Sequence, residues 1–324
     1  MTCAYLLQDS TPVGPAMIVT RHPIQSRQQW LAMRQEDVTA SDVPALFNAS
    51  PYKSEFQLYA EKAGLPVATE MTNIMQRGQW LEPAVVRACQ DLHPEWEIEQ
   101  LSVYLREPEL KLGATPDAIA TVRGNGPTDT VNCQLKVVAA PQFDRHWQDG
   151  VPLHIQLQCL TEAMLLNLPS SIVAVLVIDA YGAELHTYTV PRHPQAEERI
   201  LARVQGFHQN LARGLRPRAR TAEDGALLAK MFPDSVAEPV LDLSADNELP
   251  ELLEVREAVK ATLAVGKAQI EAIDARIKDK LNQAAKAELP GWRISWPTIA
   301  IPERLQPATT FRRLSVTKTK EGRG

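Results

Sequence analysis

Residues 113–138 read GATPDAIATVRGNGPTDTVNCQLKVV, and this stretch decides the fold and indicates the chemistry. Asp117 is placed at a strand turn by Pro116, and residues 130–138 form a β-branched strand of the buried type. Gln134 and Lys136 share one face of that strand, because alternate residues of a strand point the same way. An aspartate and a lysine on neighbouring strands can hold a divalent cation and contact one phosphodiester. Taken alone, such a pair is also typical of a surface ion pair, so the interpretation depends on further motifs.

Helical and strand patterns alternate around this stretch. Helices are expected at residues 28–34, 41–48, 54–63, 77–92, 151–167 and 194–213, the second opened by a Thr39/Ser41 cap. Strands are expected at residues 101–105, 113–122, 130–138, 172–178 and 184–190, the last two forming a hairpin. Strands flanked on both sides by helices predict an α/β fold around a mixed central sheet.

The carboxyl-terminal part has a different composition. Residues 216–248 are rich in proline, arginine, aspartate and alanine and are expected to link two parts of the chain. A long helix is expected at Leu249–Glu288, with apolar spacings that suit a coiled coil or hairpin, although Arg256 and Gly266 interrupt the seam. Two short strands are expected at residues 292–297 and 310–316. The predicted domains are therefore 1–215, the linker 216–248, and a helical and β-hairpin extension at 249–324.

The composition excludes several classes of protein. The apolar stretches, such as residues 172–178, are far too short to span a membrane, and the amino terminus lacks the pattern of a secretion signal. The four cysteines contain no C-x-x-C pair, which argues against a zinc or iron–sulfur site and for a reducing cytoplasm. The net charge of −5 means that any binding of nucleic acid depends on local basic groups, such as the basic tail after residue 303.

Five separated motifs give the chain a family resemblance. They occur in register along the chain as VTASDV at 38–43, SPYKS at 50–54, RGQWLEP at 77–83, GATPD at 113–117 and QLK at 134–136. In this order they resemble the YqaJ-type phage recombination nucleases, relatives of lambda exonuclease in the PD-(D/E)XK superfamily, over roughly residues 27–190. The resemblance implies a restriction-endonuclease-like fold. It also implies a metal-dependent exonuclease that acts 5′→3′ on linear double-stranded DNA and leaves a 3′ single strand for recombination.

The resemblance also implies roles for individual residues. The expected ligands of Mg²⁺, with Mn²⁺ as an alternative metal, are Glu82, Asp117, Gln134 and Leu135. Lys136 matches the catalytic lysine, and Gln158 matches a glutamine that supports the site from a helix, with Gln156 as the weaker alternative. Arg34 and Ser41 match residues on the terminal 5′-phosphate, where a guanidinium offers a planar fork for two oxygens. Ser41 could instead serve only as a helix cap.

Gln134 departs from the family pattern, because the family usually has glutamate at this position. An amide oxygen can still ligate a metal, but it brings one negative charge fewer. Either Glu82 and Asp117 supply enough charge and the enzyme works at higher Mg²⁺ or with Mn²⁺, or the protein binds DNA ends without cutting them. We favour the first interpretation, because Asp117 and Lys136 are both present.

The resemblance suggests partners as well. Double-stranded DNA ends are the expected substrate, and a single-strand annealing protein is a candidate partner, recruited by the long carboxyl-terminal helix and the basic tail. A homo-oligomer is expected, with a trimeric ring around the duplex as one form. A third interpretation is therefore that the chain acts mainly in assembly.

Overall fold

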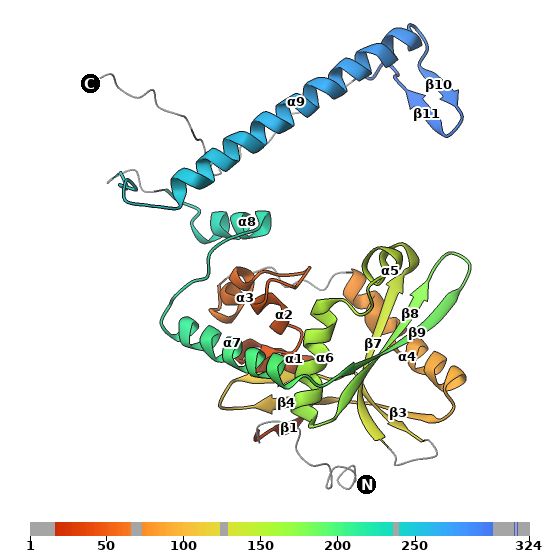
Figure 1. The fold of residues 1–324 in the computed structure, drawn as a ribbon, viewed down its shortest axis with the longest axis vertical. Coiled ribbons are helices and arrows are strands. Elements are labelled where there is room, and N and C mark those ends of the chain that lie inside the picture. The colour runs from red at the N-terminus through yellow and green to blue at the C-terminus, as the bar shows by residue number, and fades with distance from the viewer. Residues whose placement is uncertain are drawn as a thin grey trace. The chain divides into compact units, whose positions relative to one another are not determined.

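The computed structural model describes residues 17–65, 73–123, 129–235 and 240–300, together with Leu314 and Val316. The chain divides into two compact units, Met1–Phe232 and Pro233–Gly324. The first unit contains two sheets with helices against them, and the second contains a long helix and a hairpin (Figure 1). The expected strand at residues 310–316 lies outside the described residues, apart from Leu314 and Val316, which are in no strand. None of the described helices is long and apolar enough to cross a membrane.

The larger sheet of the first unit has five strands in the order β3-β6-β7-β8-β9. All neighbouring strands are antiparallel except β7 and β8, so the sheet is mixed, as predicted. A parallel pair needs a long crossover connection, and here α5 and α6 provide it. The strands are β3 (Trp96–Gln100), β6 (Ala118–Val122), β7 (Asp129–Ala139), β8 (Ser170–Ile178) and β9 (Ala183–Pro191).

Helices cover both faces of this sheet (Figure 1). Val173 and Val175 of β8 belong to one apolar core, with residues of α6 and α7, whereas Ile172 and Ala174 belong to a second core with Val85 of α4. This alternation follows from the two-residue period of a strand. The helices of the first unit are α1 (Arg27–Glu36), α2 (Val43–Leu46), α3 (Glu55–Lys62), α4 (Asn73–Leu92), α5 (Ala140–His146), α6 (Leu153–Leu166), α7 (Pro194–Ala212) and α8 (Ala222–Met231).

A second, four-stranded sheet has the order β1-β4-β5-β2. Its strands are β1 (Thr20–Pro23), β4 (Val103–Glu107), β5 (Leu112–Ala114) and β2 (Val38–Thr39). The single strand expected at residues 113–122 is therefore wrong. The chain leaves β5, turns through residues 115–117 and enters β6 of the larger sheet, because Pro116 has no N–H to continue a ladder. Asp117 thus lies at the junction of the two sheets.

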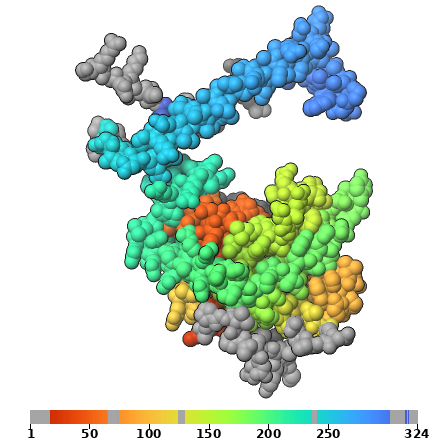
Figure 2. Space-filling view, in the orientation of Figure 1, coloured from red at the N-terminus to blue at the C-terminus, as the bar shows by residue number. Residues whose placement is uncertain are grey.

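The expected linker at residues 216–248 contains an ordered helix. Leu227 of α8 packs with Phe56 and Ala60 of α3, and Ser54 Oγ donates a hydrogen bond of 2.5 Å to Oδ1 of Asp224. Figure 2 shows the atoms of α8 lying against those of the α3 region. Composition alone marked this segment as a connector because it is rich in proline and arginine, whereas a Thr221 capping box starts a helix within it.

The second unit consists of α9 (Leu249–Leu281) and the antiparallel pair β10 (Lys286–Leu289) and β11 (Trp292–Ser295). The long helix ends seven residues before the expected Glu288, because Asn282 adopts a positive φ of 49° and the chain turns into β10. Pro290 and Gly291 form the hairpin turn rather than the helix end.

Candidate metal and phosphate site

Asp117 contacts β7 directly. Its Oδ2 accepts hydrogen bonds from the side-chain amide of Gln134 and, at 2.9 Å, from the backbone N–H of Leu135. The contact follows from the antiparallel register of β6 and β7, in which Ala118 pairs with Cys133. The structure therefore brings Asp117, Gln134 and Leu135 together, as the sequence motifs predict. A ligand role for Leu135 stays a prediction, since its described contact here is its N–H group.

Lys136 and Glu82 lie close enough to Asp117 for their charges to interact. Burial raises the pKa of Asp117, and the ammonium of Lys136 opposes that rise. Burial also raises the pKa of Glu82, with a further rise from the negative charge of Asp117 and a decrease from Lys136. Four of the predicted site residues, from α4, the β5–β6 turn and β7, therefore converge on one region.

The side chain of Gln134 is completely buried, and no described residue forms a hydrogen bond with its Oε1. A buried polar atom without a partner is energetically costly, and a bound cation would give this oxygen a partner. Among the described residues, however, no group of three His, Cys, Asp or Glu side chains is arranged to hold a metal ion. A cation here would therefore need the amide oxygen of Gln134 beside the carboxylate of Asp117, which suits Mg²⁺ because that ion takes oxygen ligands and keeps several waters.

Glu162 is a site residue that the sequence reasoning missed. It lies on α6, is 1% exposed, and accepts hydrogen bonds from Gln158 Nε2 at 2.9 Å and from Asn132 Nδ2 at 3.1 Å. Burial, and next the charge of Asp117, raise the pKa of Glu162 to about 8. Gln158 thus contacts Glu162 from the same helix, whereas Gln156 donates to the backbone carbonyl of Val151. The role of Gln158 in supporting the site stays a prediction. Glu162 could have been found as an acidic residue within a largely apolar helix, ten residues of which are buried.

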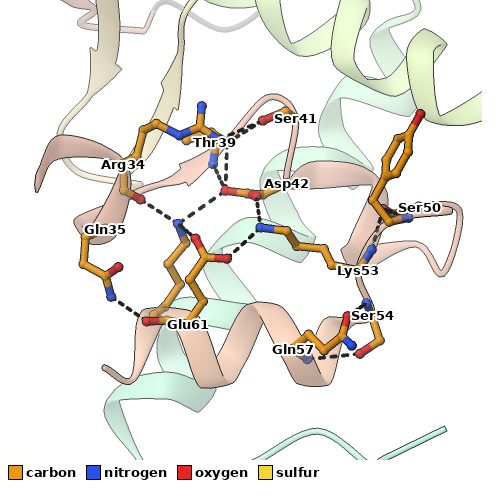
Figure 3. A network of polar contacts seen from close by, with 12 residues as sticks. Arg34, Gln35, Thr39, Ser41, Asp42, Ser50, Lys53, Ser54, Gln57 and Glu61 are labelled. Atoms are coloured by element: carbon orange, nitrogen blue, oxygen red, sulfur yellow. Dashed lines mark hydrogen bonds and ion pairs between the residues drawn. The ribbon is translucent and has the colours of Figure 1, made fainter. Parts of the chain in front are cut away.

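Arg34 and Ser41 lie side by side, as expected for two groups that share one phosphate. Arg34 Nη2 donates to Ser41 Oγ at 3.2 Å (Figure 3). The guanidinium also stacks over Trp30, at 4.7 Å from the ring centroid. Ser41 is exposed, so its hydroxyl is accessible. The predicted Thr39/Ser41 helix cap is wrong: α2 begins after Asp42, whose carboxylate instead accepts from Thr39.

A buried ion network holds this region in place (Figure 3). Asp42 is 2% exposed and pairs with Lys53 at 3.0 Å and with Lys62 at 3.3 Å. Burial acts to raise the pKa of Asp42, but Lys53, Lys62 and Arg34 together hold that pKa far below its usual range. Lys62 also donates to the backbone carbonyl of Arg34 at 2.6 Å, so the network fixes the end of α1 from which the guanidinium projects.

Trp30 links the two parts of the site. Its indole N–H donates a hydrogen bond of 2.9 Å to Thr115 Oγ1, two residues before Asp117, while its ring carries the guanidinium of Arg34. No local sequence pattern indicates this contact, because the two residues are 85 positions apart.

Comparisons with known proteins found one family model and several solved structures that are similar to parts of this chain. Curated protein sequences gave no match. Among solved structures, an alkaline exonuclease from Laribacter hongkongensis is 18% identical with a TM-score of 0.43, over 64% of this chain and 98% of that one. The structure of the same enzyme in complex with dAMP matches with a TM-score of 0.41. A phage related exonuclease from Haemophilus somnus 129PT is 12% identical with a TM-score of 0.38, over 55% of this chain and 96% of that one.

The family comparison identifies the central part of the chain. Residues 29–165 match the model of the YqaJ-like viral recombinase domain. This range includes α1 with Arg34, the turn with Asp117, the strand with Gln134 and Lys136, and the helix with Gln158. Residues 29–165 of this chain are therefore similar to the YqaJ-like viral recombinase domain.

Proposed function

We propose that the first unit is a Mg²⁺-dependent deoxyribonuclease that degrades linear double-stranded DNA from the 5′ end and leaves a 3′ single strand. The observation that carries this proposal is the convergence of Asp117, Gln134, Lys136 and Glu82 on one region. The similarity of residues 29–165 to a viral recombinase domain supports a role in recombination.

Each side chain has a defined task in such a reaction. A divalent cation, when bound, stabilises charge on the phosphate and lowers the pKa of the attacking water. Asp117 and Glu82 would hold it with carboxylate oxygens, and Gln134 with its amide oxygen. Lys136 would place an ammonium against the non-bridging oxygens, where negative charge develops. The hydrogen bond from Leu135 keeps the Asp117 carboxylate oriented on β7.

Arg34 and Ser41 support the proposed preference for a 5′-phosphate. A guanidinium and a hydroxyl at 3.2 Å from each other can bind neighbouring oxygens of one terminal phosphate. Trp30 and the Asp42 network hold the guanidinium in position. Recognition of the terminal phosphate beside the metal site favours removal of nucleotides from that end.

A separate basic cavity in the first unit suits the DNA backbone. It has a volume of about 310 Å³ and is lined by Arg216, Arg218 and Arg220 among other residues, none of them in the metal and phosphate site. Local clusters of arginine allow phosphate binding even though the net charge is −5.

A second candidate function is binding of DNA ends without cleavage. It is favoured by the neutral Gln134 and by the lack of a three-acid metal group among the described residues. This function predicts salt-sensitive binding to a duplex with no requirement for metal.

Incubation with a 5′-phosphorylated linear duplex in Mg²⁺ or Mn²⁺ separates the two functions. We expect release of mononucleotides, and a loss of about 100-fold or more in rate for Lys136→Ala, because a positioned charge at the reacting phosphate is removed. The exposed Lys230, on α8, provides the control variant Lys230→Ala, which should keep the rate of the wild type. Absence of release in both metals, or equal rates for Lys136→Ala and wild type, contradicts nuclease action at this site.

We propose further that the second unit recruits a partner, such as a single-strand annealing protein. Its long helix exposes large apolar side chains, including Val259, Leu263 and Ile270, that need a partner surface. Deletion of the chain after Asp246 should leave cleavage of short duplexes intact and reduce partner capture. The oligomeric state, including a ring trimer, is tested by mass measurement of the full chain in solution.

A further inference from the structure

Glu162 differs from the other buried carboxylates of the first unit in what compensates its charge. Asp42 pairs with two lysines, Asp37 pairs with Arg106, and Glu197 pairs with Arg192. Among the described residues, no lysine, arginine or histidine forms an ion pair with Glu162. Its two hydrogen-bond donors are the neutral side-chain amides of Gln158 and Asn132.

Two other buried acids also lack a cationic partner, but each has a structural task. Glu107 accepts a hydrogen bond of 2.6 Å from the backbone N–H of Leu110 in a turn, and Asp224 completes the capping box of α8. Among the described residues, no backbone N–H group donates a hydrogen bond to the Glu162 side chain. Burying an ionised carboxylate is strongly unfavourable unless a cation or several hydrogen-bond donors compensate its charge. A cation near Glu162 would provide that compensation.

The position of Glu162 indicates where that cation would lie. Asn132, Gln134 and Lys136 share the face of β7 that α6 covers, and Asn132 bonds Glu162 directly. The charges of Asp117 and Lys136 both act on the Glu162 carboxyl. Glu162 therefore borders the same region as the buried Oε1 of Gln134, which has no partner.

The charges of the site also balance. With Gln134 neutral, Glu82 and Asp117 against Lys136 leave one negative charge, so a bound divalent cation would give the site a net positive charge. Adding Glu162 leaves two negative charges, and one divalent cation neutralises them.

We propose that Glu162 supplies, from helix α6, the negative charge that Gln134 does not supply on β7, and so stabilises the divalent cation of the site. Gln158 and Asn132 orient its carboxylate through their amide groups. This inference rests on the proposed metal-dependent function, but it concerns binding of the ion and can be tested without DNA.

The test is a calorimetric titration of the full-length protein with Mn²⁺, and separately with Ca²⁺, at pH 8. We expect Glu162→Gln to weaken binding by about tenfold or more, as for other residues that support a metal from behind its ligands. Returning the charge to the strand, in the double variant Gln134→Glu with Glu162→Gln, should restore affinity to within about threefold of wild type. Glu107→Gln is the matched control, since it neutralises a buried acid outside this site and should leave affinity unchanged.

Two results would overturn the inference. One is an equal affinity of Glu162→Gln and wild type for both ions. The other is weak binding by Glu162→Gln that the added Gln134→Glu does not restore, which would mean that Glu162 only holds Gln158 in place. Circular dichroism spectra of the variants show whether each is folded. If the single variant is not folded, the double variant decides the test.

Metal binding with the expected order of affinities among the variants but no DNA cleavage would reject the proposed nuclease function and leave this inference standing. Absence of binding to wild type would reject both.

Discussion

Gly113 offers a sharp test of how β5 is packed beside the site. A Cβ atom at this position would lie 2.0 Å from the hydroxyl oxygen of Tyr104 and 2.4 Å from its Cζ. Tyr104 is completely buried and cannot easily move, because its hydroxyl donates a hydrogen bond of 3.0 Å to Asp37. We therefore expect Gly113→Ala to displace the tyrosine ring and the strand that leads to Asp117.

The cost has two parts. Overpacking a filled core costs about 1 to 3 kcal/mol. Losing a hydrogen bond to a buried carboxylate costs about 1 to 3 kcal/mol more. A total of about 4 kcal/mol corresponds to a decrease in melting temperature of about 8 to 16 °C for a domain of this size.

Thermal unfolding followed by circular dichroism measures this effect. Gly206→Ala is the control, because Gly206 lies in α7 with nothing within 4 Å of its added Cβ. Alanine there should stabilise the helix by about 0.5 to 1 kcal/mol. A Gly113→Ala protein that melts within about 2 °C of wild type would refute the packing argument.

Three further predictions concern charged groups. Asp42→Asn leaves the buried ammonium of Lys62 without its main partner, so urea denaturation should show a loss of about 3 kcal/mol or more, whereas a loss below about 1 kcal/mol would contradict the network. Arg34→Lys removes the planar fork, so KM for 5′-phosphorylated duplex should rise about tenfold with little change for 5′-hydroxyl duplex, and equal changes on both substrates would reject 5′-phosphate recognition. The pKa of Glu162 is raised from 4.5 to about 8 in the folded state, so the folded protein holds the extra proton between those values. The contribution of this group to the free energy of unfolding of the metal-free protein should therefore fall as pH rises from about 5 to 8, and this fall should be absent in Glu162→Gln. Parallel pH profiles of the two proteins would contradict the raised pKa.

Local patterns predicted much of the larger sheet. The alternation in β7, the β8–β9 hairpin and α6 appear close to their expected bounds, because side-chain periodicity determines which face of an element is buried. The division of residues 113–122 between two sheets was not predictable. It depends on Gly113 packing against Tyr104, and no local pattern reports a contact between separate strands. The bounds of α9 also differ, because a single residue in the left-handed region, Asn282, ended a pattern that periodicity alone would have continued.

Some residues of the candidate site were likewise predictable from the sequence and others were not. The family motifs predicted that Asp117 and Gln134 meet, and their side chains are hydrogen-bonded, because motif residues on neighbouring strands have a fixed register. The catalytic role of Lys136 stays a prediction. Glu162 and Trp30 were missed, since each acts through a partner far away in the sequence. Glu162 nevertheless follows a largely apolar run in helix α6, in which nine other residues are buried, and an acid in such a setting merits attention in related sequences.

The parallel pairing of β7 with β8 has a practical consequence for truncated versions of this protein. The family match ends at residue 165, whereas β8 spans Ser170–Ile178 and bonds to the strand that carries Gln134 and Lys136. A fragment trimmed to the matched range would leave that strand with one row of unsatisfied backbone amides and a strip of bare aliphatic surface. Such an edge favours aggregation, so an isolated fragment of the first unit should extend at least through α7, to Ala212.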